Sequence, residues 1–302
     1  MTTKSERTHR DSVAPMGMGA ANIEARVAAS MGELDSVTPE FVSALDVPYG
    51  GVLFALPALL ALGLIDSTQG FLRLPKGYYG LDSLLVLLAF MALARLQSVE
   101  SLRYCAPGEW GKLLGLDRVP EVRTLRAKIR LLSGEGKPEQ WSAALSQRWM
   151  HAAPEQAGTL YIDGHVRVYN GDQRLCLRAT TDYWVNALDG QPFFVVNQAV
   201  DPGLIKVIEQ DIVPRLERDV PGQPSAETLA AQPLWHRFTL VFDRKGYSPE
   251  FLRRMKARRI ACLSYHKFPG ADWPQQEFCD YPIKLPTGEL VPMKLGPSAA
   301  PA

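Results

Sequence analysis

Two aspartates that each close a short apolar run are the residues of this chain best suited to chemistry. The first run, residues 160–164, reads LYIDG, and the second, residues 238–243, reads FTLVFD. An apolar run closed by Asp predicts a buried strand that brings a carboxylate to the edge of a sheet. Two such carboxylates, Asp163 and Asp243, are the minimum for holding a divalent metal used in phosphodiester chemistry. The alternative is that each aspartate only forms the turn after its strand.

The elements expected around these aspartates decide whether the two carboxylates meet. We expect strands at residues 160–169, 174–180, 192–197, 238–242 and 260–265, and helices at 201–213 and 249–258. Hairpin signals at residues 170–172 and 189–190 connect the first three strands. The order of three strands, helix, strand, helix and strand is the connectivity of an RNase H-like core, in which the first and fourth strands are neighbours. The expected fold is therefore a mixed α+β or α/β domain with Asp163 close to Asp243.

The first half of the chain has a helical pattern. We interpret residues 1–35, which are rich in small and polar types, as a disordered or loosely helical tail, and Thr38-Pro39 as the start of a helix. The apolar stretches 51–65 and 84–96 are shorter than the roughly 18 to 20 residues that span a bilayer, so we expect buried helices and no membrane span. A helical region at 36–150 is thus expected before a domain of mixed strands and helices at 155–302.

Residues 107–132 have the pattern of a helix-turn-helix. A short helix, PGEWGKLL, is followed by the turn GLDRVP and by a second helix, residues 121–132. One side of the second helix is apolar, and the other carries four cations: Arg123, Arg126, Lys128 and Arg130. Two short helices joined by a turn that contains glycine, the second of them basic, favour DNA binding. A solvated amphipathic helix is the alternative.

Charge and cysteine content narrow the class of protein. The net charge of the 302 residues is +1, so the whole chain is not a polycation, but residues 244–267 hold eight Lys or Arg and one Glu. Clustered cations of this kind are a local footprint for nucleic acid or a solvated helix face. The four cysteines form no C-x-x-C pair, so we expect neither structural zinc nor a disulfide framework. A polar N-terminus without an apolar core predicts no signal peptide and a cytoplasmic protein.

Three segments together make the chain resemble a DDE-type insertion-sequence transposase with an RNase H-like catalytic core. They are GEWGKLLGLDRVPEVRTLR, YIDGHVRVYNG and VFDRKGYSPEF. The resemblance, over residues 36–290, implies that Asp163 and Asp243 are the first two acids of an Asp-Asp-Glu set that binds two Mg²⁺ (or Mn²⁺) ions. It implies that residues 36–150 are a DNA-binding region and that residues 155–302 are the catalytic domain. It also implies DNA strand cleavage at element ends and transfer of the freed 3′-hydroxyl to target DNA.

The same resemblance sets the expected partners. They are double-stranded DNA, at element ends and target, and further copies of the chain, at the nucleoid in the cytoplasm, with no membrane and no small-molecule cofactor. DNA contacts are expected from these residues: Arg123, Thr124, Arg126, Lys128, Arg130, Arg244 and Lys245.

The last part of the sequence departs from this family pattern. The third acid is expected on a helix well after the second, but Glu277 and Glu289, the glutamates after Glu250, lie on no predicted helix. We therefore expect a truncated product that cleaves DNA weakly or not at all. One alternative is a non-catalytic DNA-binding protein that competes for element ends. Another is a haloacid-dehalogenase-like phosphatase, suggested by His165 two residues after Asp163.

Overall fold

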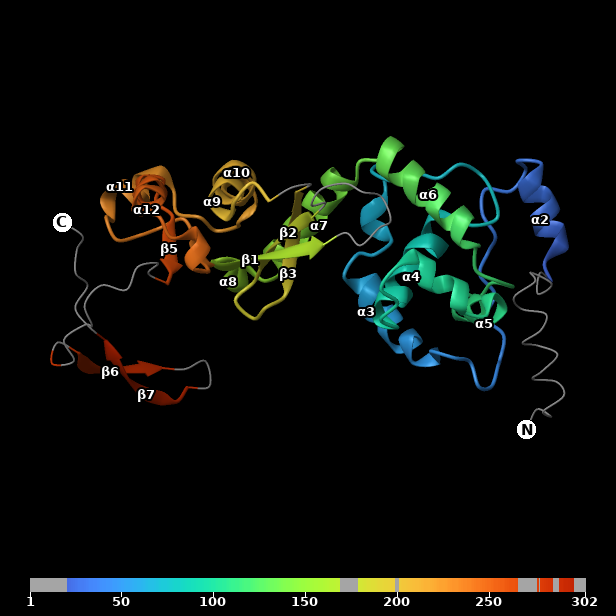
Figure 1. Cartoon of the computed structure of the whole chain (residues 1–302), viewed down its shortest axis with the longest axis horizontal. Helices are drawn as coiled ribbons and strands as arrows, with labels where there is room; N and C mark the ends of the chain where they lie inside the picture. The colour runs from blue at the N-terminus through green and yellow to red at the C-terminus, as the bar shows by residue number, and fades with distance from the viewer. Residues whose placement is uncertain are drawn as a thin grey trace. The chain divides into compact units, whose positions relative to one another are not determined.

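The computed structural model describes residues 21–168, 179–198, 201–265, 276, 278–284 and 288–295. The chain forms two compact units: Met1–Pro154 with Asp219–Pro221, and Glu155–Arg218 with Gly222–Ala302. We call them the helical unit and the sheet unit, after the elements that each contains (Figure 1). In the described part of the chain, no helix combines the length and the apolar character that crossing a membrane requires.

The helical unit consists of α-helices joined by short 3₁₀ helices. They are α2 (Ile23–Ser30), η2 (Gly50–Ala55), α3 (Leu56–Ala61), η3 (Asp66–Thr68), α4 (Leu81–Leu93), η4 (Val99–Tyr104), α5 (Pro107–Leu113), α6 (Val122–Glu135) and α7 (Pro138–Ala152). A further short helix, α8 (Pro154–Ala157), leads into the sheet unit. Helices therefore occur where the sequence pattern predicts a helical region.

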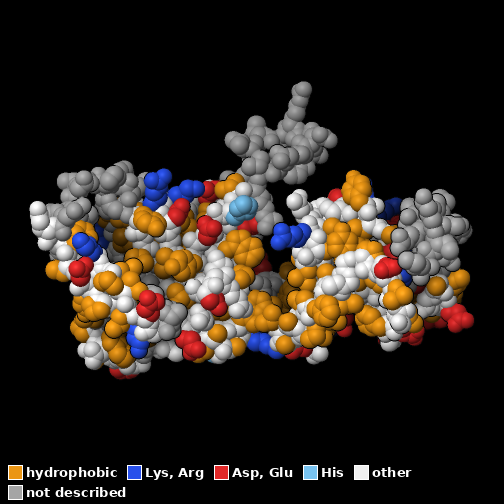
Figure 2. Space-filling view, turned by 90° about the horizontal axis from the view of Figure 1, so that it is seen from below, with side chains coloured by type: hydrophobic (Ala, Val, Ile, Leu, Met, Phe, Trp, Pro, Cys, Tyr) orange, Lys and Arg blue, Asp and Glu red, His pale blue; other side chains and the backbone are white. Residues whose placement is uncertain are grey.

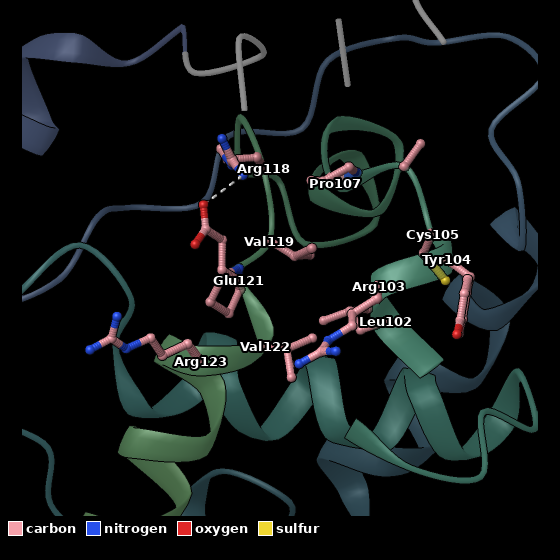
Figure 3. A pocket seen from close by; sticks show the side chains of 12 residues that line it. Leu102, Arg103, Tyr104, Cys105, Pro107, Arg118, Val119, Glu121, Val122 and Arg123 are labelled. Carbon is pink, nitrogen blue, oxygen red and sulfur yellow. Dashed lines mark ion pairs between the residues drawn. The ribbon is translucent and has the colours of Figure 1, made fainter. Parts of the chain in front are cut away.

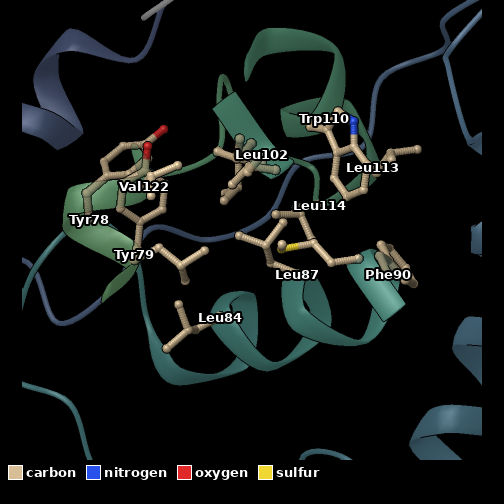
Figure 4. Close-up of a cluster of buried hydrophobic side chains, with 14 of the residues drawn as sticks. Tyr78, Tyr79, Leu84, Leu87, Phe90, Leu102, Trp110, Leu113, Leu114 and Val122 are labelled. Carbon is tan, nitrogen blue, oxygen red and sulfur yellow. The ribbon is translucent and has the colours of Figure 1, made fainter. Parts of the chain in front are cut away.

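Helix α4 is central to the core of the helical unit. Its side chains Leu84, Leu87 and Phe90 are buried among those of the following helices. Figure 4 shows all three on the side of α4 that faces the other labelled residues of the cluster, which include Trp110 and Leu113 of α5. The expectation of a buried helix in this apolar stretch is confirmed, because a helix that is apolar on nearly every side is stable in water only when it is enclosed.

The other apolar stretch, residues 51–65, does not form the buried helix that its composition predicts. It forms η2 and the short helix α3, and neither contains a fully buried residue. Pro57 lies in the first turn of α3, where it cannot continue a preceding helix. Val52 and Leu56 pack against the core, but Phe54 is 91% exposed. Figure 2 shows that hydrophobic side chains also lie elsewhere at the surface, between charged ones.

Residues 23–30 form the helix α2, so for this part of the predicted tail the helical alternative is confirmed and the disordered one is wrong. Asn22 caps this helix, because its side chain accepts a hydrogen bond from the backbone N–H of Ala25 at 3.2 Å. None of the residues of α2 is fully buried. The helix therefore depends on contacts made by individual side chains. Residues 1–20 lie outside the described part of the chain.

The helix predicted to start at Thr38-Pro39 does not form. The backbone N–H of Val37 instead donates to the carbonyl of Tyr78 at 3.0 Å, and Val37 is buried in the core. Three residues later, the backbone N–H of Glu40 donates to the carbonyl of Gly115 at 2.7 Å. These bonds to distant segments hold the chain out of a helix, so tertiary contacts override the local capping signal.

Five strands of the sheet unit form one mixed sheet. They are β1 (Thr159–Val168), β2 (Ala179–Asn186), β3 (Pro192–Gln198), β4 (Thr239–Phe242) and β5 (Ala261–Ser264), in the order β3-β2-β1-β4-β5. The first three are antiparallel to their neighbours, whereas β4 runs parallel to β1 and β5 parallel to β4. The prediction that the first and fourth strands are neighbours is confirmed. Residues 170–178, with the predicted hairpin turn, lie outside the described residues.

Helices cover one face of this sheet. They are α9 (Leu204–Val207), the π-helical turn η5 (Ile208–Ile212), α10 (Val213–Asp219), α11 (Ala226–Ala231), η6 (Arg244–Gly246) and α12 (Pro249–Ala257). As predicted, α12 begins after Ser248, whose hydroxyl accepts from the backbone N–H of Phe251 at 3.3 Å. Phe251 is fully buried, with its ring centroid 5.8 Å from that of Phe242 in β4. Strands β6 (Cys279–Lys284) and β7 (Leu290–Leu295) form a separate antiparallel hairpin.

Candidate functional site

Asp163 and Asp243 lie at neighbouring positions on two adjacent parallel strands. In the pairing of β1 with β4, Ile162 is opposite Phe242, and each aspartate is the next residue along its chain. The backbone of Asp243 is still extended, with φ −69° and ψ 172°. Because neighbouring strands lie about 4.8 Å apart, the two carboxylates start from adjacent backbone positions. The juxtaposition expected from the strand order is therefore present.

Both carboxylates belong to the same, more exposed face of the sheet. Ile162 and Phe242 are buried toward the helices, whereas Tyr161, one residue before Ile162, is 45% exposed. Side chains alternate between the two faces of a strand, so Asp163 lies on the Tyr161 side, and Asp243 occupies the equivalent position on β4. Both aspartates are exposed. We call this the carboxylate face.

The loop after β4 fixes the position of Asp243. The carboxylate of Asp243 accepts a hydrogen bond from the backbone N–H of Lys245 at 2.9 Å, and its carbonyl accepts one from the hydroxyl of Ser264 at 2.9 Å. Gly246 is required in this loop, because a Cβ atom there would collide with the ring of Phe242. Arg244 and Lys245 are consequently exposed next to the carboxylate.

His165 lies further along β1 and is exposed. It is opposite Asp182, which is buried within β2 and accepts a hydrogen bond from the side-chain amide of Asn197. A dehalogenase-like phosphatase would need an aspartate in place of His165 and a helix after the first strand. Here β1 continues to Val168 and pairs with β2. The phosphatase interpretation is therefore not supported.

A tyrosine–aspartate pair that the sequence did not single out joins β2 to the segment before α9. The hydroxyl of Tyr183 donates to Asp201 at 2.5 Å, and the backbone N–H of Gly203 donates to the same carboxylate at 2.8 Å. The bond from Tyr183, together with that from Gly203, lowers the pKa of Asp201. Burial, with the same bond, raises the pKa of Tyr183. At neutral pH the Tyr183 hydroxyl therefore keeps its proton and the Asp201 carboxyl is ionised.

Carboxylate oxygens are suitable ligands for a hard divalent cation. Among the described residues, no group of three or more His, Cys, Asp or Glu side chains is arranged to hold a metal. Asp163 and Asp243 therefore offer a pair of ligands rather than a complete set. Of the two later glutamates, Glu277 lies outside the described residues, and Glu289 is exposed beside the β6–β7 hairpin.

Helices α5 and α6 lie where the predicted helix-turn-helix places them. The connection between them, residues 114–121, is longer than the three or four residues of a standard helix-turn-helix. It folds back on α5, because the backbone N–H of Val119 donates to the carbonyl of Pro107 at 3.0 Å. Gly111 permits this, since a Cβ atom there would lie 2.6 Å from the Cα of Arg118. The recognition role of α6 stays a prediction.

The cations predicted on α6 differ in their surroundings. Arg123 and Arg130 are exposed, as is Thr124. Arg126 forms an ion pair with Glu100 of η4. Lys128 is partly buried, and this burial lowers the pKa of its ammonium group. The sequence periodicity therefore identifies the polar side of α6 but not which cations are unpaired there.

A pocket of about 520 Å³ lies between η4 and the start of α6 (Figure 3). Arg103 and Arg123 line it from the two helices, and Arg118 and Glu121 line it from the connection. Arg118 and Glu121 form an ion pair at 3.7 Å. The pocket is thus predominantly cationic, and it adjoins the exposed side of α6.

Asp117, in the connection between α5 and α6, holds helix α2 in place. Its carboxylate accepts hydrogen bonds from Nε of Arg26 at 2.9 Å and from the hydroxyl of Tyr78 at 2.6 Å. The guanidinium of Arg26 also lies 3.9 Å from the ring centroid of Tyr78. Burial opposes ionisation of Asp117, but the bonds from Arg26 and Tyr78 outweigh it and lower the pKa of the carboxyl. We call these three residues the Asp117 clamp.

Much of the basic segment after β4 is engaged in internal contacts. Arg254 binds both oxygens of Glu209, at 2.6 and 3.0 Å, and Arg258 binds both oxygens of Glu217, at 3.1 and 2.6 Å. Arg259 donates to backbone carbonyls, including that of Pro233 at 2.6 Å. The density of Lys and Arg in the sequence therefore overstates the charge that this segment offers to DNA.

Comparison with known protein families identifies a match over nearly the whole chain. A family described as "Transposase protein" matches residues 17–300. No curated protein and no solved structure matches the chain. Transposases act on DNA, so the match implies that this protein binds DNA. The chain belongs to this transposase family.

Proposed function

We propose that the sheet unit is the RNase H-like catalytic domain of a DDE-type transposase and that it cleaves DNA strands weakly with divalent metal, because among the described residues Asp163 and Asp243 supply only part of a ligand set. The observation that carries this proposal is the position of Asp163 and Asp243, next to each other on the same face of adjacent parallel strands. The strand order β3-β2-β1-β4-β5, with three antiparallel strands followed by two parallel ones, supports the RNase H-like assignment.

Asp163 and Asp243 would hold Mg²⁺ or Mn²⁺ through their carboxylate oxygens. When bound, such ions activate the attacking oxygen and stabilise the leaving oxygen of a phosphodiester. The hydrogen bond from the backbone N–H of Lys245 orients the Asp243 carboxylate, and the exposed side chains of Arg244 and Lys245 are placed to bind the DNA phosphates beside it.

The helical unit would bind duplex DNA through the exposed side of α6. Arg123 and Arg130 carry charge on this side, and Thr124 can donate a hydrogen bond to phosphate. Arg126 would contribute once it leaves Glu100, and Lys128 least, because it is partly buried. Replacing Arg123 and Arg130 with Ala should weaken duplex binding and reduce the slope of log affinity against log salt by about 0.9 per lost phosphate contact. Lys76→Ala, which removes an exposed cation of a loop, is the matched control.

The test of the catalytic proposal is nicking of supercoiled plasmid in Mn²⁺ by the full chain, Asp163→Asn and Asp243→Asn. We expect each variant to lose at least about a hundredfold in rate, since each removes a ligand that positions the attacking oxygen. Mn²⁺ binding, followed by electron paramagnetic resonance, should fall in parallel. Asp189→Asn, at the exposed turn between β2 and β3, should change neither.

Two results would contradict the proposal. One is nicking that persists in both aspartate variants, and the other is Mn²⁺ binding that neither variant weakens. Duplex binding without nicking by any variant would instead favour the alternative of a non-catalytic DNA-binding protein.

A further inference from the structure

Glu100 of η4 binds two arginines from different elements. One carboxylate oxygen pairs with Arg103 of the same 3₁₀ helix at 3.1 Å, and the other pairs with Arg126 of α6. Helix η4 packs directly against α6, so this carboxylate lies beside the proposed DNA-binding side. A single anion therefore holds two of the cations that this region could offer to phosphate.

The surroundings of these arginines suit an extended polyanion. Figure 3 shows Arg103 and Arg123 from the two helices around the same pocket, with Tyr104 at its rim. Tyr104 is 91% exposed and has no role in the core. A DNA backbone lying along α6 could contact these cations in turn, because successive phosphates of a strand offer repeated binding sites for Arg side chains.

The arginines that are paired with Glu100 can exchange this carboxylate for another anion. The side chains of Glu100, Arg126 and Arg103 are 38%, 49% and 61% exposed. Ion pairs that remain this accessible to water contribute little to stability and are screened by salt. Replacing one carboxylate by phosphates that can bind both guanidiniums is therefore favourable at low cost to the fold.

We propose that Glu100 is an internal competitor of DNA phosphate: it holds Arg103 and Arg126 in the free protein and releases them to the DNA backbone on binding. Glu100 thereby lowers the affinity of the helical unit for DNA of any sequence, since phosphate contacts carry no sequence information. Contacts to base edges are unaffected, so specific and non-specific binding weaken by about the same factor and their ratio stays the same. This inference rests on the proposed DNA-binding role of α6 and adds Arg103 to its contact residues.

The experiment measures binding of a fluorescent 30-base-pair duplex to the full chain at several NaCl concentrations. Glu100→Gln keeps the size of the side chain but frees both arginines. We expect it to bind about threefold to tenfold more tightly at 0.1 M salt. Its salt slope should be modestly steeper, because rising salt screens the Glu100 ion pairs of the unmodified chain and so reduces the gain. Glu135→Gln is the matched control, because it removes the same charge from the exposed end of α6 without releasing Arg103 or Arg126. Its slope should stay that of the unmodified chain.

A second variant links the gain to the released arginines. In the triple variant Glu100→Gln, Arg103→Ala, Arg126→Ala, the added affinity and the added slope should disappear. An unchanged or weaker affinity of Glu100→Gln, in a protein whose thermal unfolding is unaltered, would overturn the inference. If that result accompanies weaker binding by the Arg123→Ala, Arg130→Ala variant, the DNA-binding role of α6 stands and only the role of Glu100 fails. If none of these variants alters binding, the DNA-binding side itself is wrong.

Discussion

Replacing Asp117 with Ala should release helix α2 from the helical unit. Asp117 is 5% exposed at its side chain and accepts hydrogen bonds from Arg26, from Tyr78 and from the backbone N–H groups of Ala21 and Asn22. None of the residues of α2 is fully buried. Without the carboxylate, the apolar contacts of α2 with the core are those of partly buried side chains such as Ala25 and Ala29.

The size of the effect follows from the burial of the pair. Breaking a buried ion pair by removing one partner costs about 3 to 5 kcal/mol. The side chain of Arg26 keeps 26% exposure and can rehydrate, which favours the lower value, about 3 kcal/mol. That free energy corresponds to roughly a hundredfold faster hydrogen exchange of the α2 amides. If the loss is shared by the whole unit of about 150 residues, its Tm falls by about 6 to 12 °C.

Hydrogen–deuterium exchange with peptide-level mass spectrometry measures this release directly. Asp35→Ala is the control, because Asp35 forms an exposed ion pair with Lys76 at 2.9 Å and its loss should leave α2 unchanged. Equal exchange of residues 23–30 in the Asp117 variant and the unmodified chain would refute the reasoning. It would show that other contacts hold α2.

The stabilisation by Asp117 should also depend on pH. The pKa of its carboxyl is lower in the folded protein than its ordinary value of about 3.9. The contribution is therefore complete above that value and is lost as the pH falls through the folded pKa. Thermal unfolding should show a difference in Tm between the unmodified chain and Asp117→Asn that is constant from pH 7 to 5 and shrinks below about pH 4. A difference that grows on acidification would contradict the sign of the shift.

Two further predictions concern the fit of α5 and the accessibility of cysteines. Gly111→Ala should lower the free energy of unfolding in urea by more than about 2 kcal/mol, because the new Cβ would lie 2.6 Å from backbone. Gly134→Ala, in α6 with open space around it, should instead raise that free energy by up to about 1 kcal/mol, and equal effects would count against the contact. Burial raises the pKa of Cys262 to about 12, so iodoacetamide at pH 8 should alkylate exposed Cys279 long before Cys262. Peptide mapping would show this order, and comparable rates in the folded protein would refute it, whereas both should react alike in urea.

The strand order and the position of the two aspartates could be predicted without coordinates. An apolar run such as 238–242 can be recognised in the sequence because β4 buries Leu240 and Phe242 on one face and leaves the other face only half-buried. The capping signal at Ser248 is equally local, since the hydroxyl and the N–H that it binds are three residues apart. The individual strands and the cap depend only on near neighbours in the chain, whereas the pairing of β1 with β4 is inferred from the order of the elements.

Other features depend on partners far away in sequence, which no local pattern contains. The sequence of residues 23–30 does not by itself predict a stable helix, because the contact that holds this helix is made by Arg26 with Asp117, 91 residues later. The polar side of α6 follows from helical periodicity, but the pairing of Arg126 follows from Glu100, on a different element. Tertiary packing determines which side chains meet across the fold. The charge that a surface offers to a ligand is therefore a property of the tertiary structure, whereas the strands and helices that carry this charge can be predicted from the local sequence.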